Sequence, residues 1–92
     1  MSQYKEEVIP INDLFNDAIE MIKDYDKDFS NEILLKLYGL FKQSTVGDNT
    51  NDEPSKFSIK QHKKWESWKS FNGLTLEEAK QQYISLVVEL IN

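Results

Sequence analysis

The segment from Leu40 to Thr50, LFKQSTVGDNT, changes from an apolar helical pattern to a polar loop within a few residues. Its first half continues a run in which apolar residues recur at helical spacing from Ile33 onward. Its second half is rich in Thr, Gly, Asp and Asn, which favour turns. The segment therefore predicts the end of a long helix. Lys42 stands at that end, where it is either a solvated charge or the partner of a ligand.

Helical periodicity extends to four segments of the chain, and no stretch alternates as a strand would. Ser30 is expected to cap the second helix, and capping boxes are expected at Ser58 and Thr75. Gly73 is expected to end the third helix. The four predicted helices cover residues 12–25, 30–46, 58–73 and 75–90.

The connections between these helices differ in length. Residues 26–29 and 72–74 are short links, which favour antiparallel neighbours. Residues 47–57 are polar, contain Pro54 and lack periodicity, so they form either a long crossover or a functional segment. The prediction is an all-α fold: a four-helix bundle with one long crossover loop, in a single domain spanning residues 1–92.

The composition narrows the classes of function. The chain has no cysteine, which excludes thiol catalysis, cysteine-based zinc sites and disulfides. The single histidine, His62, is expected to be exposed. The acidic loop residues are expected to be solvated, because the sequence around them lacks the glycine and the glutamate that a calcium-binding loop requires. No nucleophile–base pair is present, so an enzyme is not expected. With one histidine and no cysteine, a metal site is not expected either.

The charge and the N-terminus indicate where the protein acts. The net charge is −5 and every basic residue is lysine, so nucleic-acid binding is not expected. The first residues lack the apolar core of a signal peptide, and no run reaches the roughly 18 apolar residues that cross a membrane. A cytoplasmic location is the expectation.

The lysines are concentrated in the middle of the chain. Residues 36–64 carry six lysines against three acids, whereas residues 1–35 carry three lysines against nine acids. Lys60 and Lys64 are four residues apart on one helix, a spacing at which like charges repel each other. An anion between them would turn this repulsion into attraction. Trp65 and Trp68 lie on the neighbouring face and are expected in the core. The basic region is either a solvated face or a site for a small anionic ligand.

The second helix pairs rings with a charge. Tyr38, Phe41 and Lys42 are at positions i, i+3 and i+4, so they are neighbours on the helix surface. The apolar face of this helix covers about 160°, which is wider than one-sided packing requires. A wide apolar face edged by tyrosine and lysine suits a ligand with an apolar part and an anionic part.

Three blocks of sequence together resemble a known family. Residues 38–48, YGLFKQSTVGD, resemble the signature Y-x-x-[YF]-K-Q-A-T-x-G-D of the acyl-CoA-binding protein family. Residues 63–68, KKWESW, resemble its K-W-x-[AS]-W motif, and Tyr83-Ile84 resembles its A-Y-[IV] element. The resemblance covers nearly the whole chain, from about Leu14 to Leu90. It departs at Phe41, where many members have tyrosine, and in residues 1–10, an N-terminal extension that either covers the groove or is disordered.

The resemblance implies an up-down-down-up four-helix fold that binds medium- and long-chain fatty acyl-CoA thioesters. It implies an intracellular carrier and pool-former with no bond chemistry and no cofactor, expected to be a monomer with transient contacts to acyl-CoA-using enzymes or membranes. The alternative is a helical protein-interaction module that uses the apolar groove for a partner helix. The acyl-CoA-binding residues implied by the resemblance are Lys23, Tyr38, Gly39, Leu40, Phe41, Lys42, Lys60, Lys64 and Tyr83.

Overall fold

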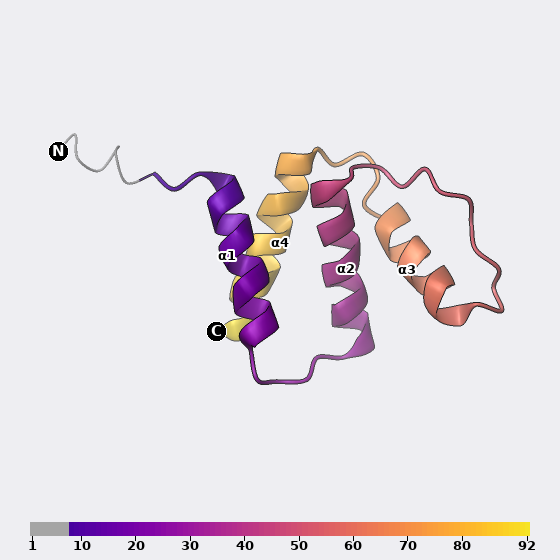
Figure 1. Cartoon of the computed structure of the whole chain (residues 1–92), viewed down its shortest axis with the longest axis horizontal. Helices are drawn as coiled ribbons and strands as arrows, with labels where there is room; N and C mark the ends of the chain where they lie inside the picture. Colours follow the sequence, from indigo (N-terminus) through magenta and orange to yellow (C-terminus); the bar gives the residue numbers. More distant parts are fainter. Residues whose placement is uncertain (1–7) are drawn as a thin grey trace.

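The computed structural model describes residues 8–92, and this part of the chain is all-α. Figure 1 shows the chain running along α1, back along α2, then through a long loop to α3, which runs in the same direction as α2, and finally along α4 in the direction of α1. The predicted up-down-down-up topology is confirmed. The helices are α1 (Ile11–Asp24), α2 (Asn31–Thr45), α3 (Ile59–Lys69) and α4 (Leu76–Ile91).

Helix α2 is central to the packing. It packs against α4 on one side and against α3 on the other, while α1 packs against α4 (Figure 1). α3 lies beyond α2, away from α1. The main core therefore forms where α1, α2 and α4 meet, and its buried residues are Phe15, Ala18, Leu37, Leu40, Tyr83 and Val87.

Two of the three predicted helix caps are confirmed. The Ser30 hydroxyl accepts a hydrogen bond from the Ile33 N–H at 3.2 Å. Thr75 and Glu78 form both bonds of a capping box, at 2.9 and 3.0 Å. The capping box predicted at Ser58 is wrong. Ser58 has ψ 72 instead of the extended ψ near 160 of the other two caps, so its hydroxyl makes no capping bond.

The third helix is shorter than predicted. It ends at Lys69, and bonds between residues three apart then tighten the chain through Phe71 and Asn72. Gly73 follows this turn with φ 99, a conformation that favours glycine. The prediction that Gly73 ends the third helix is therefore wrong, because Gly73 ends the turn that follows the helix.

The predictions for residues 1–10 lie mostly outside the described residues. Residues 8–10 lead directly into α1, where the Pro10 carbonyl accepts hydrogen bonds from the N–H groups of Asp13 and Leu14 at 3.0 and 3.2 Å. Proline is suited to this position because it has no N–H to leave unpaired at the start of a helix.

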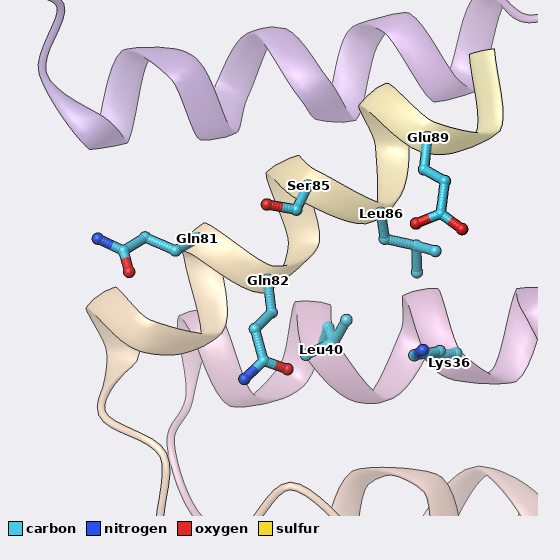
Figure 2. Close-up of a pocket in the computed structure, with 7 residues that line it drawn as sticks. All are labelled: Lys36, Leu40, Gln81, Gln82, Ser85, Leu86 and Glu89. Carbon is cyan, nitrogen blue, oxygen red and sulfur yellow. The ribbon is translucent and has the colours of Figure 1, made fainter. Parts of the chain in front are cut away.

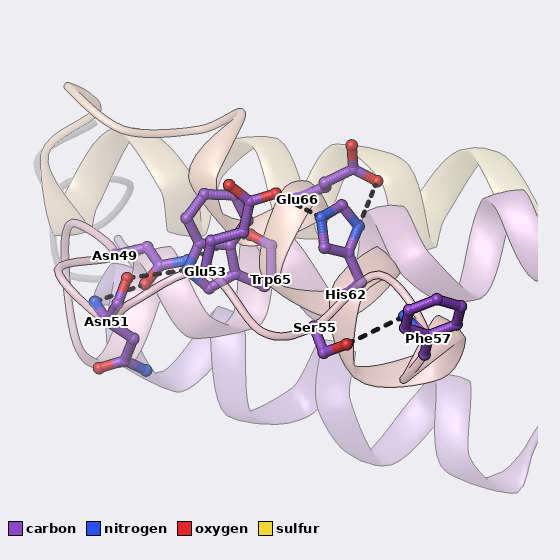
Figure 3. Close-up of polar contacts among 8 residues, drawn as sticks. All are labelled: Asn49, Asn51, Glu53, Ser55, Phe57, His62, Trp65 and Glu66. Atoms are coloured by element: carbon purple, nitrogen blue, oxygen red, sulfur yellow. Dashed lines mark hydrogen bonds and ion pairs between the residues drawn. The ribbon is translucent and has the colours of Figure 1, made fainter.

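The crossover loop is attached to α3 by both tryptophans. The Trp65 indole N–H donates to the Asn51 carbonyl at 2.9 Å, and that of Trp68 donates to the Gly47 carbonyl at 2.7 Å. Asn49 is fully buried and donates through its amide to the Trp65 carbonyl at 3.1 Å (Figure 3). Trp68 is buried, as predicted. The prediction that Trp65 lies in the core is wrong, because Trp65 bonds to the crossover loop and is only half-buried. The loop is thus an ordered crossover.

Candidate functional site

A cavity of about 630 Å³ opens between the N-terminal halves of α2 and α3. This volume is in the range of pockets that hold drug-sized ligands. Its α2 wall is mainly apolar, and three lysines of α3 edge the other side. The lining residues are Asn31, Leu34, Leu35, Tyr38, Ile59, Lys60, Lys63 and Lys64.

A second cavity, of about 320 Å³, lies on the α1 side of α2. It is lined by apolar and aromatic residues of α1, α2 and α4 and of the link before α2. Leu34 and Tyr38 line both cavities, so the two meet along α2. We call this combined surface the α2 groove. The residues of its second part are Ile22, Phe29, Leu34, Leu37, Tyr38, Phe41 and Tyr83.

Two lysines near α2 rest on aromatic rings, and of the two only Lys64 lines the α2 groove. The Lys64 ammonium lies 4.7 Å from the centre of the Tyr38 ring, and the Lys42 ammonium lies 4.8 Å from the centre of a Trp68 ring. Both distances are typical of cation–π contacts. Within residues 8–92, neither ammonium forms an ion pair with a carboxylate. The two positive charges are therefore available to an anionic ligand.

Three rings cluster where α1, α2 and α4 meet, and two of them, Phe41 and Tyr83, line the groove. The Phe41 ring stacks at 6.2 Å from Phe15, and the Tyr83 ring meets Phe15 edge-on at 5.2 Å. Phe41 is 38% exposed, while Tyr83 is buried. Burial raises the pKa of the Tyr83 phenol, so the hydroxyl stays neutral and can serve as a hydrogen-bond donor at the groove wall.

The other residues implied by the resemblance are more dispersed. Lys60 lies on the groove edge, and Lys23 is an exposed residue near the end of α1, 3.8 Å from Glu20. Leu40 is buried in the core, and Gly39 faces α3, where an added Cβ would lie 2.6 Å from the Ser67 hydroxyl. Ligand contacts at Lys23, Gly39 and Leu40 stay predictions, and the structure gives the last two a packing role.

A third cavity, of about 400 Å³, lies between α2 and α4 on the far side of Leu40. Figure 2 shows the α4 side chains Gln82 and Leu86 directed toward Leu40 and Lys36 of α2. Its lining mixes leucines with amides, a hydroxyl and both signs of charge, and contains no ring. With one lysine and one glutamate, this cavity lacks the positive charge that a row of phosphates needs. Its lining residues are Lys36, Leu40, Gln81, Gln82, Ser85, Leu86 and Glu89.

The prediction that His62 is exposed is wrong. Only 13% of its side chain is exposed, and its ring lies between two carboxylates (Figure 3). One ring nitrogen is 2.6 Å from Glu53 of the crossover loop, and the other is 3.5 Å from Glu66. The hydrogen bond to His62 is the main cause that lowers the pKa of Glu53. Within residues 8–92, no group of three metal-ligating side chains forms, and no helix is both long and apolar enough to span a bilayer.

The end of α2 that carries Lys42 is held by a polar network. The adjacent Gln43 is fully buried, and its amide donates to Asp48 at 2.8 Å and to the Leu74 carbonyl at 2.9 Å. Asp48 also accepts from the Gly73 N–H at 2.8 Å. The hydrogen bond from the Gly73 N–H and, to a smaller extent, that from the Gln43 amide lower the pKa of the Asp48 carboxyl. Gln43 and Asp48 of the motif thus join α2, the crossover loop and the residues just before α4.

This network predicts a pH dependence of stability. Because the pKa of Asp48 is lowered in the folded state, its stabilisation is present above the unfolded value of about 3.9 and is lost as pH falls through the folded value. Asp48→Asn should therefore reduce stability at pH 7 and lose less further stability below about pH 4. Urea unfolding at neutral and acid pH measures both.

Asp17→Asn, which removes an exposed carboxylate of α1, is the charge-matched control and should behave like wild type. An acid-side loss of stability that is equal in Asp48→Asn and wild type would contradict the role of Asp48.

Some groove residues were not identified from the sequence. Asn31, Leu35 and Lys63 line the cavity between α2 and α3, and Phe29 precedes α2 beside the second cavity. Leu35 and Tyr38 are three residues apart, and Lys60 and Lys63 repeat this spacing on α3. The spacing within each helix was thus a usable signal, but the pairing of the two helix faces was not.

Comparison with known proteins identifies the family. The family model described as "Acyl CoA binding protein" matches residues 12–87. This chain belongs to the acyl-CoA-binding protein family. It is 48% identical over 77 residues to acyl-CoA-binding protein homolog 1 of Caenorhabditis elegans, covering 84% of this chain and 90% of that protein. It is 38% identical over 81 residues to the acyl-CoA-binding protein of Saccharomyces cerevisiae, covering 88% and 93%.

Solved structures of acyl-CoA-binding proteins have the same fold. The crystal structure of acyl-CoA-binding protein 2 of Oryza sativa matches with a TM-score of 0.85 and 39% identity, covering 89% of this chain and 91% of that chain. That of the protein from Moniliophthora perniciosa matches with a TM-score of 0.80 and 31% identity, covering 87% and 79%. The resemblance found in three sequence blocks is therefore confirmed for the acyl-CoA-binding domain as a whole.

Proposed function

We propose that this protein binds medium- and long-chain fatty acyl-CoA in the α2 groove and carries it within the cell, without making or breaking bonds. The observation that carries the proposal is that apolar surface and positive charge occur together at α2. Leu34 and Tyr38 join two largely apolar cavities, and Lys64 lines this groove without a carboxylate partner among residues 8–92. Lys42, which also has none among those residues, follows the groove residue Phe41 in α2. Family membership supports the same ligand.

The energetics favour the whole thioester over either of its parts. A palmitoyl chain has about fourteen methylenes, and burying them gives roughly 11 kcal/mol before the cost of ordering the chain. Each charge-assisted hydrogen bond to a phosphate adds about 1.5–3 kcal/mol. The chain should therefore supply most of the affinity, and the lysines should select the CoA ester over the free fatty acid.

The test is calorimetry with palmitoyl-CoA, free CoA and palmitate. We expect saturable binding of palmitoyl-CoA with one ligand per protein, and affinity at least about a hundredfold weaker for each of the other two, because each lacks one of the two contributions. No saturable binding of palmitoyl-CoA at micromolar concentration would contradict the carrier function. The groove would then fit the alternative, a site for the apolar face of a partner helix.

A carrier must also receive and release its ligand. Because a long acyl chain partitions into lipid, exchange with membranes or with acyl-CoA-using enzymes is part of the proposed function. No cofactor is needed for binding and transfer of this kind.

A further inference from the structure

An apolar and basic surface surrounds the start of α3. Phe57 is 98% exposed and Ile59 is 66% exposed, the two most exposed large apolar side chains among residues 11–92. Exposed lysines stand on either side of them. We call this surface the α3 lip, and its residues are Lys56, Phe57, Ile59, Lys60 and Lys63.

The Phe57 ring is not used by the fold. Its backbone N–H is held by the Ser55 hydroxyl at 3.2 Å, and Figure 3 shows the ring lying clear of the other residues drawn there. Phe57 is absent from the lining of the α2 groove, whereas Ile59, Lys60 and Lys63 belong to it. The lip is therefore the outer edge of the cavity between α2 and α3, and Leu34, 48% exposed, continues it on the α2 side.

The lip has a charge opposite to that of the rest of the protein. Residues 56–64 carry four lysines and no acid, although the whole chain has a net charge of −5. A negatively charged surface would attract the lip and repel most of the remaining molecule. Contact with such a surface would therefore favour one orientation, with the mouth of the cavity toward it.

We propose that the α3 lip docks this protein onto bilayers that contain anionic lipid. An aromatic ring and a branched aliphatic side chain between lysines match the acyl–headgroup boundary, where apolar groups enter the lipid and ammonium groups remain among the phosphates. The surface has only two large apolar side chains among three lysines, so it suits reversible attachment better than a shaped protein interface. Its use in exchanging acyl-CoA rests on the proposed function, while the docking rests on the lip alone.

The test is flotation of the ligand-free protein with vesicles of phosphatidylcholine, with and without phosphatidylserine. We expect binding that requires phosphatidylserine and weakens with salt. Phe57→Ala and Lys56→Glu should each weaken it roughly tenfold, since one removes the inserted ring and the other reverses a charge. Neither residue lines the groove, so both variants should keep wild-type affinity for palmitoyl-CoA in solution.

Val46→Ala is the matched control, because Val46 is also exposed, at 60%, but lies just after the other end of α2. It should float like wild type. No flotation with either vesicle would overturn the proposal and favour an acidic protein as the partner. Equal flotation with and without phosphatidylserine would overturn the requirement for anionic lipid. Equal weakening by Val46→Ala would overturn the location of the docking surface. Because palmitoyl-CoA calorimetry needs no vesicles, failure of the proposed function and failure of docking are distinguishable.

Discussion

Gly39→Ala should destabilise the protein by about 1–3 kcal/mol, although alanine is the better helix former. Gly39 lies inside α2 where this helix touches α3. A Cβ there would lie 2.6 Å from the Ser67 hydroxyl oxygen, 2.7 Å from the Ser67 carbonyl oxygen and 2.8 Å from Cε2 of Phe71. Helix propensity alone would stabilise the variant by about 1 kcal/mol. A net loss of stability would therefore show that the close contacts with α3 outweigh the propensity.

Thermal unfolding measures this effect as a fall in midpoint of roughly 5–20 °C for a domain of this size. Ser85→Ala, at an exposed position of α4, measures the propensity contribution alone and should be neutral or slightly stabilising. Adding Ser67→Ala to Gly39→Ala should not restore stability, because the Ser67 carbonyl and Phe71 remain in the way. A Gly39→Ala variant as stable as wild type would show that α3 can move aside at no cost.

Gly39→Ala also connects the fold to the site. The Ser67 hydroxyl donates to the Leu35 carbonyl at 2.5 Å, so the same contact that excludes a Cβ holds α3 against α2. Both walls of the larger cavity belong to these two helices. Moving α3 outward would shift Lys64 from Tyr38, and affinity for palmitoyl-CoA should fall together with stability.

The sequence was sufficient to predict those features that depend on neighbours along one helix. The apolar periodicity identified four helices, and Thr75 with Glu78 formed the capping box that their spacing indicates. The pairing of Lys60 with Lys64 on one side of α3 is likewise a matter of spacing, and both line the same cavity. Local rules of this kind do not require knowledge of the packing.

Features that depend on contacts between distant segments could not be predicted in the same way. Lys64 lies on Tyr38 of another helix, and no spacing within α3 indicates that ring. His62 is covered because the non-periodic crossover loop brings Glu53 to it. Ser58 fits a capping box by residue type, yet the turn before α3 gives it a backbone conformation in which the cap does not form.

Replacing Lys64 should cause the largest loss of ligand affinity from a single change. Lys64→Met should weaken palmitoyl-CoA binding roughly ten- to hundredfold, because it removes one charge-assisted hydrogen bond to a phosphate. Methionine keeps an apolar stem against the Tyr38 ring, so the variant separates the lost charge from lost packing. Calorimetry at two salt concentrations should show that the remaining affinity depends less on salt.

Combining Lys64→Met with Lys42→Met extends the test to Lys42, which follows the groove residue Phe41 in α2. If each lysine holds a phosphate independently and each loss is ten- to hundredfold, the two losses should multiply, to roughly a hundred- to ten-thousandfold. Lys36→Met is the control, since Lys36 belongs to the same helix as Lys42 but lines the cavity on the opposite side. A Lys64→Met variant that binds palmitoyl-CoA like wild type would remove Lys64 from the site. Acyl-CoA would still be the ligand, and the phosphates would then have to be held by Lys42 and Lys60.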